Sequence, residues 1–436
     1  MKNRREFLKS SAMVAAASMA GIAGAPQFSF GQAAGGKTFV KVFMRGGADG
    51  LHLFPAVGDT EYYNHRPNLA IEPPGNGIHS AIDIGDTYRG MNPNLEPLME
   101  IWDAGRMMVA PSTAMDDGGR SHFDNQRWIG KGARNNLIDG YLNRYMQEVA
   151  GPVHPLRGAT LGKTSVSTDI KGSITVPAIQ DRQGFELENR DLCSGDGCAD
   201  NQLTDMMREI SSHEVDQPGI ETDIRDNQLI MLDSIAEVQA AGMNATVDAD
   251  GLDYSNSRLG RGLRLVAQLL KAGVPLEVAA LDWNIGWDSH SNQLPENLQG
   301  QFASEEHGYH RRMREGATDF LTFYRDMGQM MDNVVVLVGT EFGRTVIENG
   351  SRGTDHGKGS TWFAYGGPTM GGVAPDITSL AREELFQTRF VPTVTEYRDI
   401  VAEIMIRHMN MPENLVATVL PNHQFTNHNL FSRPIA

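Results

Sequence analysis

The stretch Thr38-Phe-Val-Lys-Val-Phe-Met44, followed directly by Arg45-Gly-Gly-Ala-Asp-Gly50, decides the fold that we expect for this chain. β-Branched and aromatic residues dominate the first part, and such a run ended by a glycine-rich loop is typical of a buried strand. The strand would stop at the loop. Asp49 would therefore lie just past the carboxyl end of a strand.

Three more apolar runs have the same character, because Gly, Ser, Asp or Thr follows each of them closely. They are Met107–Ala110, Leu276–Leu281 and Val334–Val338. Apolar residues at helical spacing occupy other segments, at 139–149, 222–243, 259–272, 309–331 and 395–409. Strands alternating with helices predict an α/β fold, with a doubly wound, mostly parallel sheet and helices on both faces. Ligands of such sheets bind at the carboxyl ends of the strands.

We expect residues 35–436 to form a single domain of this kind, with a helical insertion at about 150–255. That range is richer in Ser, Asp, Asn and Gly, and it contains the two cysteines of the chain, Cys193 and Cys198. In an oxidising compartment the two thiols would form one small disulfide. The alternative, a metal site built on two thiolates, lacks a nearby His or Cys partner.

The first residues indicate export. Asn3-Arg-Arg-Glu-Phe-Leu-Lys9 matches the twin-arginine signal, an Ala-rich apolar stretch follows at 12–25, and small residues stand at 32–34. We therefore expect residues 1–34 to be a cleaved signal peptide, the twin-arginine translocase to be a partner during export, and the protein to be periplasmic or secreted. The alternative is an uncleaved membrane anchor. No later stretch is apolar for long enough to span a bilayer, so no stable span is expected after cleavage.

Composition narrows the functions further. The 436 residues carry 38 Lys and Arg against 54 Asp and Glu, a net charge of −16, and 40% are hydrophobic. This excludes a fibre, a disordered tail and a polytopic membrane protein. The acidic balance disfavours nucleic-acid binding, which needs a basic face. A small anionic substrate is still allowed, because a metal ion or a few arginines can reverse the field inside one cleft.

Potential metal ligands follow the predicted strands in four clusters. They comprise Asp49, then Asp288 and His290, then Glu341, and finally Asp355 and His356. Mixed carboxylate and imidazole ligands suit Zn, Mn or Fe, whereas an all-oxygen set suits Mg or Ca. Each cluster has an alternative: a turn-forming Asp before Gly, a helix cap for Asp288 and His290, and an ion pair of Glu341 with Arg344. Their common position after strands favours one site for one or two divalent ions.

A fifth cluster, Arg120-Ser-His-Phe-Asp124, opens a predicted helix. Ser121 with Asp124 three residues later fits an N-cap. The same geometry allows catalysis, because a hydroxyl at the positive end of a helix and near a metal can attack phosphorus or sulfur. Amide groups and Arg120 would then hold the anionic oxygens.

Five motifs, in order behind the twin-arginine signal, resemble the DUF1501 family over nearly the whole mature chain. They are Arg45-Gly-Gly-Ala-Asp-Gly-Leu51, Arg120-Ser-His-Phe-Asp124, Trp287-Asp-Ser-His-Ser-Asn-Gln293, Thr340-Glu-Phe-Gly-Arg-Thr345 and Gly353-Thr-Asp-His-Gly357. The family is similar to the alkaline phosphatase and sulfatase superfamily, which hydrolyses or transfers phosphate and sulfate esters at a metal centre.

The resemblance implies a role for individual residues. Asp49 would be the metal ligand after the first strand, Ser121 the nucleophile, Asp288 and His290 the ligands of one metal, and His356 the late histidine ligand. The superfamily's late strand usually ends in Asp-His, where this chain has Glu341-Phe342. Asp355 and His356 would have to supply the missing imidazole. The spacing of Asp288 and His290 is also tighter than in the superfamily.

The sequence thus predicts an exported, metal-dependent hydrolase of small anionic phosphate or sulfate esters. The metal ligands would be the six residues named above, with Ser121 as nucleophile and Arg120 or Arg344 neutralising the charge of the transition state. The alternative is a non-catalytic exported binding or assembly protein with a degenerate metal site. A third option, a partner subunit of an exported redox enzyme, lacks any cofactor motif. The oligomeric state is not predicted.

Overall fold

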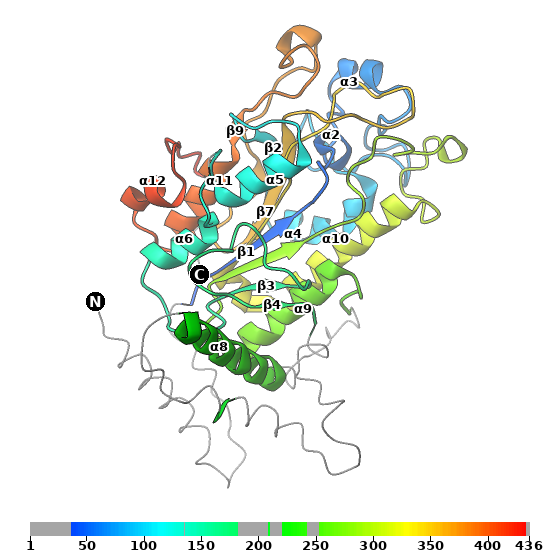
Figure 1. Cartoon of the computed structure of the whole chain (residues 1–436). Helices are drawn as coiled ribbons and strands as arrows, with labels where there is room; N and C mark the ends of the chain where they lie inside the picture. Colours follow the sequence, from blue (N-terminus) through cyan, green and yellow to red (C-terminus); the bar gives the residue numbers. More distant parts are fainter. Residues whose placement is uncertain (1–35, 135, 182–207, 210–219, 242–252, 433–436) are drawn as a thin grey trace.

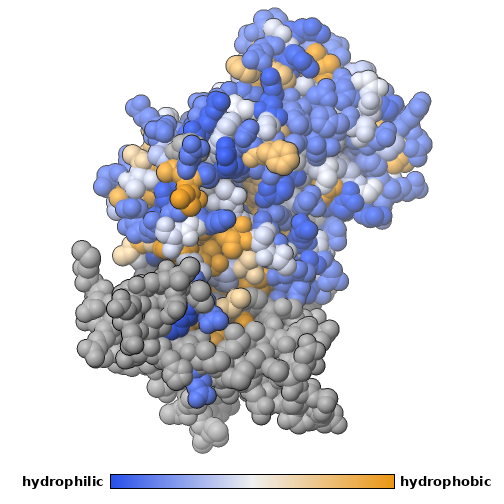
Figure 2. Space-filling model, in the orientation of Figure 1, coloured by the Kyte–Doolittle hydropathy of each residue, from blue (hydrophilic) through white to orange (hydrophobic). Residues whose placement is uncertain are grey.

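The computed structural model describes residues 36–134, 136–181, 208–209, 220–241 and 253–432. The predicted signal peptide and the pair Cys193 and Cys198 lie outside these residues. No helix among the described residues is both long enough and apolar enough to cross a membrane. The face drawn in Figure 2 is mostly hydrophilic, with hydrophobic residues in scattered groups.

One mixed sheet forms the centre of the molecule, with the strand order β4-β3-β5-β1-β6-β7-β2-β8, and β9 also pairs with β2. All pairs are parallel except those of β7 with its two neighbours β6 and β2. The strands are β1 Thr38–Phe43, β2 Met107–Ala114, β3 Gly158–Leu161, β4 Ala178–Ile179, β5 Val278–Asp282, β6 Val334–Gly339, β7 Ser360–Gly366, β8 Gly372–Val373 and β9 Thr395–Glu396. The predicted mostly parallel α/β sheet is confirmed.

Helices cover both faces of this sheet (Figure 1). The longer ones near the sheet are α5 His122–Lys131, α6 Tyr141–Glu148, α9 Arg258–Lys271, α10 Gly308–Met327 and α11 Tyr397–Glu403, and α8 Ile220–Ala241 packs against α9. The predicted helix at 309–331 continues past α10 as a 3-10 turn, and the one at 395–409 begins with β9 and ends as a π-helix at Ile404–His408.

The alternation of side chains along β1 explains the two layers. Val40 and Val42 belong to one buried cluster, whereas Phe39 and Phe43 belong to a second cluster on the opposite face. Successive side chains of a strand point to opposite faces, so a central strand with helices on both sides needs apolar residues throughout.

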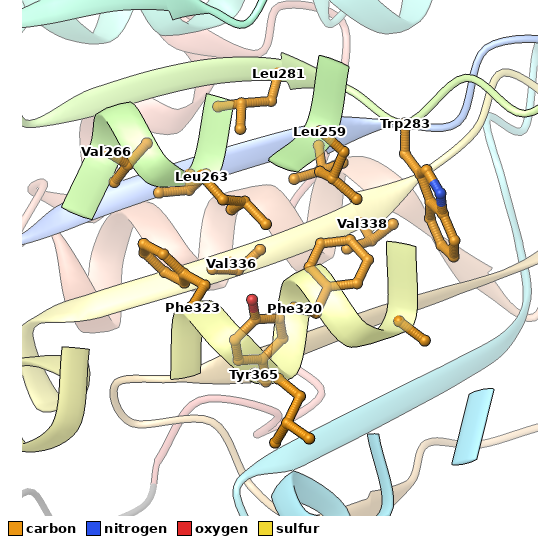
Figure 3. Close-up of a cluster of buried hydrophobic side chains, with 14 of the residues drawn as sticks. Leu259, Leu263, Val266, Leu281, Trp283, Phe320, Phe323, Val336, Val338 and Tyr365 are labelled. Atoms are coloured by element: carbon orange, nitrogen blue, oxygen red, sulfur yellow. The ribbon is translucent and has the colours of Figure 1, made fainter. Parts of the chain in front are cut away.

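Figure 3 shows the first cluster, where side chains of α9 and α10 meet those of the sheet. Leu263 of α9 and Phe320 of α10 lie over Val336 of β6, and each of the three is 0% exposed. Burial of such side chains contributes about 1.5–3 kcal/mol each, so this layer holds both helices on the sheet.

The range expected to be an insertion contributes to the sheet. Gly158–Leu161 forms β3, which pairs in parallel with β5, and Ala178–Ile179 adds β4 at the edge. Only four and two residues long, these strands are too short to show a periodic pattern. The part of the range around α8 is helical, as expected.

Register places the predicted polar clusters at one edge of the sheet. β1 lies between β5 and β6, and Phe43 at its end is opposite both Asp282 and Gly339. The glycine turn after β1 packs closely against the neighbouring loops. Gly47 has a φ of +67°, and a Cβ on it would lie 2.5 Å from the Phe342 ring. Only glycine fits such a backbone without strain.

Candidate metal site

Three histidines and one aspartate converge beyond the carboxyl ends of the parallel strands. His122 is the first residue of α5, directly after the N-cap Ser121. Asp288 and His290 lie in the loop that follows β5, and His356 lies in the connection from β6 to β7. Four side chains from three separate segments are therefore held at one place by the sheet.

The potential ligand atoms lie at distances that suit a shared ion. Nε2 of His290 is 3.0 Å from Nε2 of His356, and these two nitrogens are 3.1 and 3.2 Å from Oδ1 of Asp288. Nε2 of His122 is 3.4 Å from Oδ2 of the same carboxylate. Ligand atoms about 2.0–2.1 Å from a tetrahedral ion are separated by roughly 3.3 Å. The potential ligand atoms of His122, Asp288 and His356 all lie within 4.8 Å of one another, so these three residues could share one ion, and His290 contacts two of them.

Each histidine uses its other nitrogen to donate a hydrogen bond that fixes the ring. Nδ1 of His122 lies 2.7 Å from Oε1 of Glu341, and Nδ1 of His290 lies 3.0 Å from Oδ1 of Asp355. Nδ1 of His356 lies 2.9 Å from the carbonyl oxygen of Arg120. An acceptor at Nδ1 selects the tautomer whose Nε2 carries a free lone pair. Each of the three Nε2 atoms therefore presents a lone pair that could bind a metal ion.

Glu341 forms the buried floor beneath His122. Its carboxylate also accepts hydrogen bonds from the backbone of Gly46 at 2.9 Å and from the amide of Gln126 at 2.8 Å. Burial alone would raise the pKa of Glu341, but these donors and His122 hold it below its usual value. The Glu341 hydrogen bond in turn raises the pKa of His122. A more basic imidazole is a stronger metal ligand once the ion replaces the proton.

Arg344 balances the charge of Asp288. Its guanidinium is fully buried and donates from Nη1 to Oδ1 of Asp288 at 2.8 Å. Burial alone would raise the pKa of Asp288, but the hydrogen bond and charge of Arg344 hold it below its usual value. The carboxylate is therefore ionised and available to a cation.

The site has a buried base and an open side. The side chains of Glu341 and Arg344 are 0% exposed, whereas those of Asp288 and His290 are 44% and 47% exposed. Solvent and a small molecule can thus approach the ligand atoms from one direction, as a catalytic ion requires.

The residues fit a transition-metal ion. Nε2 of His122 is buried and has no hydrogen-bond partner, so an ion would satisfy this atom. His122, Asp288 and His356 are the one group of potential metal ligands found in the described part of the chain, and His290 contacts two of them. Three imidazoles with one carboxylate suit Zn, Mn or Fe, and do not suit the all-oxygen preference of Mg or Ca.

Asp49 is placed elsewhere, which corrects its predicted role as a ligand. Both of its carboxylate oxygens bind Arg66, at 2.7 and 3.0 Å, and Oδ2 also accepts from Gln293 at 2.8 Å. Gln293 in turn accepts from Thr354, two residues before His356. The oxygens of Asp49 are therefore occupied by a buried arginine that the sequence did not predict. Through Gln293, Asp49 stabilises the loops behind the site.

Glu341 and Asp355 were predicted as direct metal ligands, but in the structure their carboxylates contact the histidines and not the position where an ion would lie. Each holds the Nδ1 of a histidine and so orients a ligand. The predicted Asp288, His290 and His356 do converge on one point. His122 was missed, although it stands inside the Arg120–Asp124 motif. A histidine at the first position of a helix whose N-cap is already suspected is the signal that could have identified it.

Ser121 and Arg120 border the site, and their side chains form hydrogen bonds with residues other than the four potential ligands. Ser121 is the N-cap of α5, and its Oγ accepts from the backbone of Asp124 at 3.5 Å. The Arg120 side chain donates to Gln387 and lies over the Phe390 ring, while its carbonyl holds His356. Ser121 thus stands between two residues of the site, with its hydroxyl exposed to solvent.

Replacing Glu341 with glutamine should weaken metal binding about 10- to 100-fold, the usual cost of changing the partner of a metal-bound histidine. Glutamine retains the shape but removes the charge that fixes the His122 tautomer. Titration of zinc against a chelating indicator measures the change. Glu277→Gln is the matched control, because Glu277 pairs with Arg157 at the opposite end of β5. Equal affinities of E341Q and the wild type would contradict the assignment.

The model of the family of unknown function DUF1501 matches residues 108–424, a range that contains all four proposed ligands. No curated protein matches the sequence. The chain is similar to the crystal structure of the lipoteichoic acid synthase LtaP from Listeria monocytogenes, with 12% identity and a TM-score of 0.36, over 93% of this chain and 76% of that chain. The chemistry of the site must therefore decide between functions.

Proposed function

The chain belongs to the DUF1501 family, and from this premise we propose that it is an exported, metal-dependent hydrolase of small phosphate or sulfate esters. The observation that carries the proposal is the group of His122, Asp288 and His356, whose potential ligand atoms lie within 4.8 Å of one another, with His290 in contact with two of them and the Nδ1 of each histidine held by an acceptor. An acceptor at the second ring nitrogen of each histidine is typical of metal sites, and a simple surface ion pair does not require one.

The proposed ligands are His122, His290, His356 and Asp288. A divalent ion bound there would act as a Lewis acid and stabilise negative charge that develops on the oxygens of an ester. Arg344 lies beneath Asp288 and adds a fixed positive charge at the base of the site. A preorganised charge of this kind stabilises an anionic transition state without moving during the reaction.

We assign the nucleophile to Ser121. Its hydroxyl is exposed at the N-terminus of the ten-residue helix α5, next to His122, and the free amides of the first turn favour anionic oxygens. In the first step the Ser121 oxygen would bond to phosphorus or sulfur. The bond to the alcohol oxygen would break, and this oxygen would receive the serine proton. Water would then cleave the Ser121 ester and restore the hydroxyl.

Replacing Ser121 with alanine should reduce turnover of 4-nitrophenyl phosphate or sulfate by at least about 100-fold, because the nucleophile is lost, with metal content unchanged. Alanine also removes the N-cap, which costs about 1 kcal/mol. Ser121→Asn is therefore the control, since asparagine caps a helix well but cannot attack. Loss of turnover in both variants supports the assignment of Ser121 as the nucleophile. Wild-type turnover in S121N would show that Ser121 acts only as the N-cap of α5.

The competing function is a non-catalytic exported binding or assembly protein that keeps the fold with a degenerate metal site. Elemental analysis of protein exported by its native host, together with assays of aryl phosphate and aryl sulfate turnover, separates the two. Stoichiometric metal with metal-dependent turnover is the expected result. Metal without turnover of any ester tested, or the absence of both stoichiometric metal and turnover, would contradict the hydrolase and favour the binding protein.

A further inference from the structure

A second polar cavity opens at the same edge of the sheet, beside the metal site but built from other residues. Its volume is about 470 Å³. The walls come from Arg45 after β1, from residues 162–168 after β3, from Asp282 at the end of β5, and from the first turn of α9. None of the four proposed metal ligands lines it. Cavities of this size, at the carboxyl ends of parallel strands, are where small molecules bind in α/β proteins.

Positive charge dominates this cavity in a strongly acidic protein. Arg45, Lys163, Arg258 and Arg261 line it, against the single carboxylate of Asp282. Lys163 donates to Asp282 at 2.8 Å, which neutralises that pair. Arg45 is 3.4 Å from the same carboxylate and also donates to Gln126. Arg258 and Arg261 of α9 have no acidic partner among the described residues, so an excess of positive charge faces the cavity.

Arg258 and Arg261 carry the strongest indication of a ligand. They are three residues apart, so their side chains lie on one face of the first turn of α9. The side chain of Arg258 has no hydrogen-bond partner among the described residues. Nε of Arg261 is buried and unpartnered, although another nitrogen of its guanidinium donates to the carbonyl of Asn256. Two like charges at the positive end of a helix repel each other, and a bound anion would relieve this repulsion.

Neutral donors complete the cavity. Ser165, Ser167 and Thr168 of the loop after β3 line it together with the amide of Gln180. A smaller space continues from Arg45 and Ser167 to Gln126 and also borders Asp169. Hydroxyl and amide groups combined with arginines form the set of donors that binds the oxygens of phosphate, sulfate or carboxylate groups.

We propose that this cavity is an oxyanion-binding site, separate from the metal site, for a small molecule that carries a phosphate, sulfate or carboxylate group. Arg258 and Arg261 bind the anion, and Arg45 closes the cavity on the side of the metal site. Arg45 contacts Gln126, which donates to Glu341, the residue that holds His122. The two sites are therefore neighbours that are joined by a row of hydrogen-bonded side chains.

Calorimetric titration with inorganic sulfate, at constant ionic strength, tests the proposal without using turnover. The wild type should bind sulfate at one saturable site, and Arg258→Gln with Arg261→Gln should weaken binding at least tenfold. Arg314→Gln with Arg407→Gln removes the same charge from exposed positions outside the cavity and should change the affinity less than twofold. The single variant Arg258→Gln, at an exposed position, should also weaken binding, and circular dichroism and melting temperature verify folding.

A variant of the metal site separates this proposal from the proposed hydrolase. His290→Ala with His356→Ala should bind sulfate as the wild type does, even if every esterase assay fails. Four results would overturn the oxyanion site. These are no saturable binding by the wild type, wild-type affinity in R258Q/R261Q, an equal loss in R314Q/R407Q, or a loss confined to H290A/H356A.

Discussion

Replacement of His290 and His356 by alanine is expected to abolish stoichiometric metal binding, raising the dissociation constant for zinc by more than about 100-fold. Removing the partner of a ligand typically costs 10- to 100-fold, so loss of two ligands must cost more. The two Nε2 atoms lie 3.0 Å apart and both contact Oδ1 of Asp288. The variant retains only His122 and Asp288, too few to hold a transition metal tightly.

The measurement combines elemental analysis after dialysis with competition against a zinc chelator. His79→Ala with His154→Ala is the matched control, because these histidines lie outside the site and the variant loses the same number of imidazoles. Folding should be retained in both variants, since His290 and His356 are partly exposed and belong to loops. One equivalent of bound metal in H290A/H356A would contradict the proposed ligand set.

Replacement of Arg66 by methionine should destabilise the protein by about 3–5 kcal/mol, the usual cost of leaving one member of a buried ion pair alone. Arg66 is 0% exposed and binds both oxygens of Asp49, which is 1% exposed. It also donates to the carbonyls of Val346 and Thr345, at 2.8 and 2.9 Å. The variant leaves a buried carboxylate and two carbonyls without this donor.

Denaturant unfolding, followed by tryptophan fluorescence, measures the loss. The double variant R66M with Asp49→Asn should recover part of the stability, because it removes the unpaired charge while Gln293 can still donate to the new amide. Arg314→Gln, which breaks an exposed pair with Glu96, should leave the free energy of unfolding nearly unchanged. Equal effects of R66M and R314Q on the free energy of unfolding would show that the buried ion pair contributes no more to stability than the exposed one.

The pH dependence of this effect follows from the pKa of Asp49. Burial alone would raise that pKa, but Arg66 holds it below the usual 3.8. The folded protein therefore binds fewer protons than the unfolded chain, and the contribution of the pair is present above about pH 4 and is lost as the pH falls further. In R66M burial raises the pKa instead, so Asp49 takes up a proton and loses its unpaired charge. The stability difference between the wild type and R66M should shrink between pH 7 and pH 4.

The strands that build the site could be predicted because each is a continuous apolar run in the middle of the sheet. β1, β5 and β6 are observed within two residues of their expected bounds. β7 was not predicted, although Ser-Thr-Trp-Phe-Ala-Tyr-Gly at 360–366 is rich in aromatic residues. β7 follows the Gly-rich loop of His356 after only three residues, so no separate turn signal marks where it begins. β7 also runs antiparallel to its two neighbours in the sheet, β6 and β2.

The sequence by itself determined the class of fold and the edge of the sheet at which polar residues gather. Both follow from local patterns, namely an apolar run ended by a glycine-rich or polar loop, repeated between helices. It also predicted Asp288, His290 and His356, whose side chains lie together in the structure, because each stands in a polar loop after a strand. The export signal at Arg4 and Arg5 is likewise a local pattern, and it stays a prediction.

Only the tertiary structure decided which of these side chains meet. Asp49 and Glu341 follow neighbouring parallel strands, yet Asp49 forms an ion pair with Arg66, whereas Glu341 accepts a hydrogen bond from His122. His122 is 219 residues from Glu341 in sequence, and Arg66, although only 17 residues from Asp49, is held in place by the carbonyls of Thr345 and Val346, 279 and 280 residues away. Contacts of this range are set by packing and charge balance in the folded chain, and no local pattern encodes them.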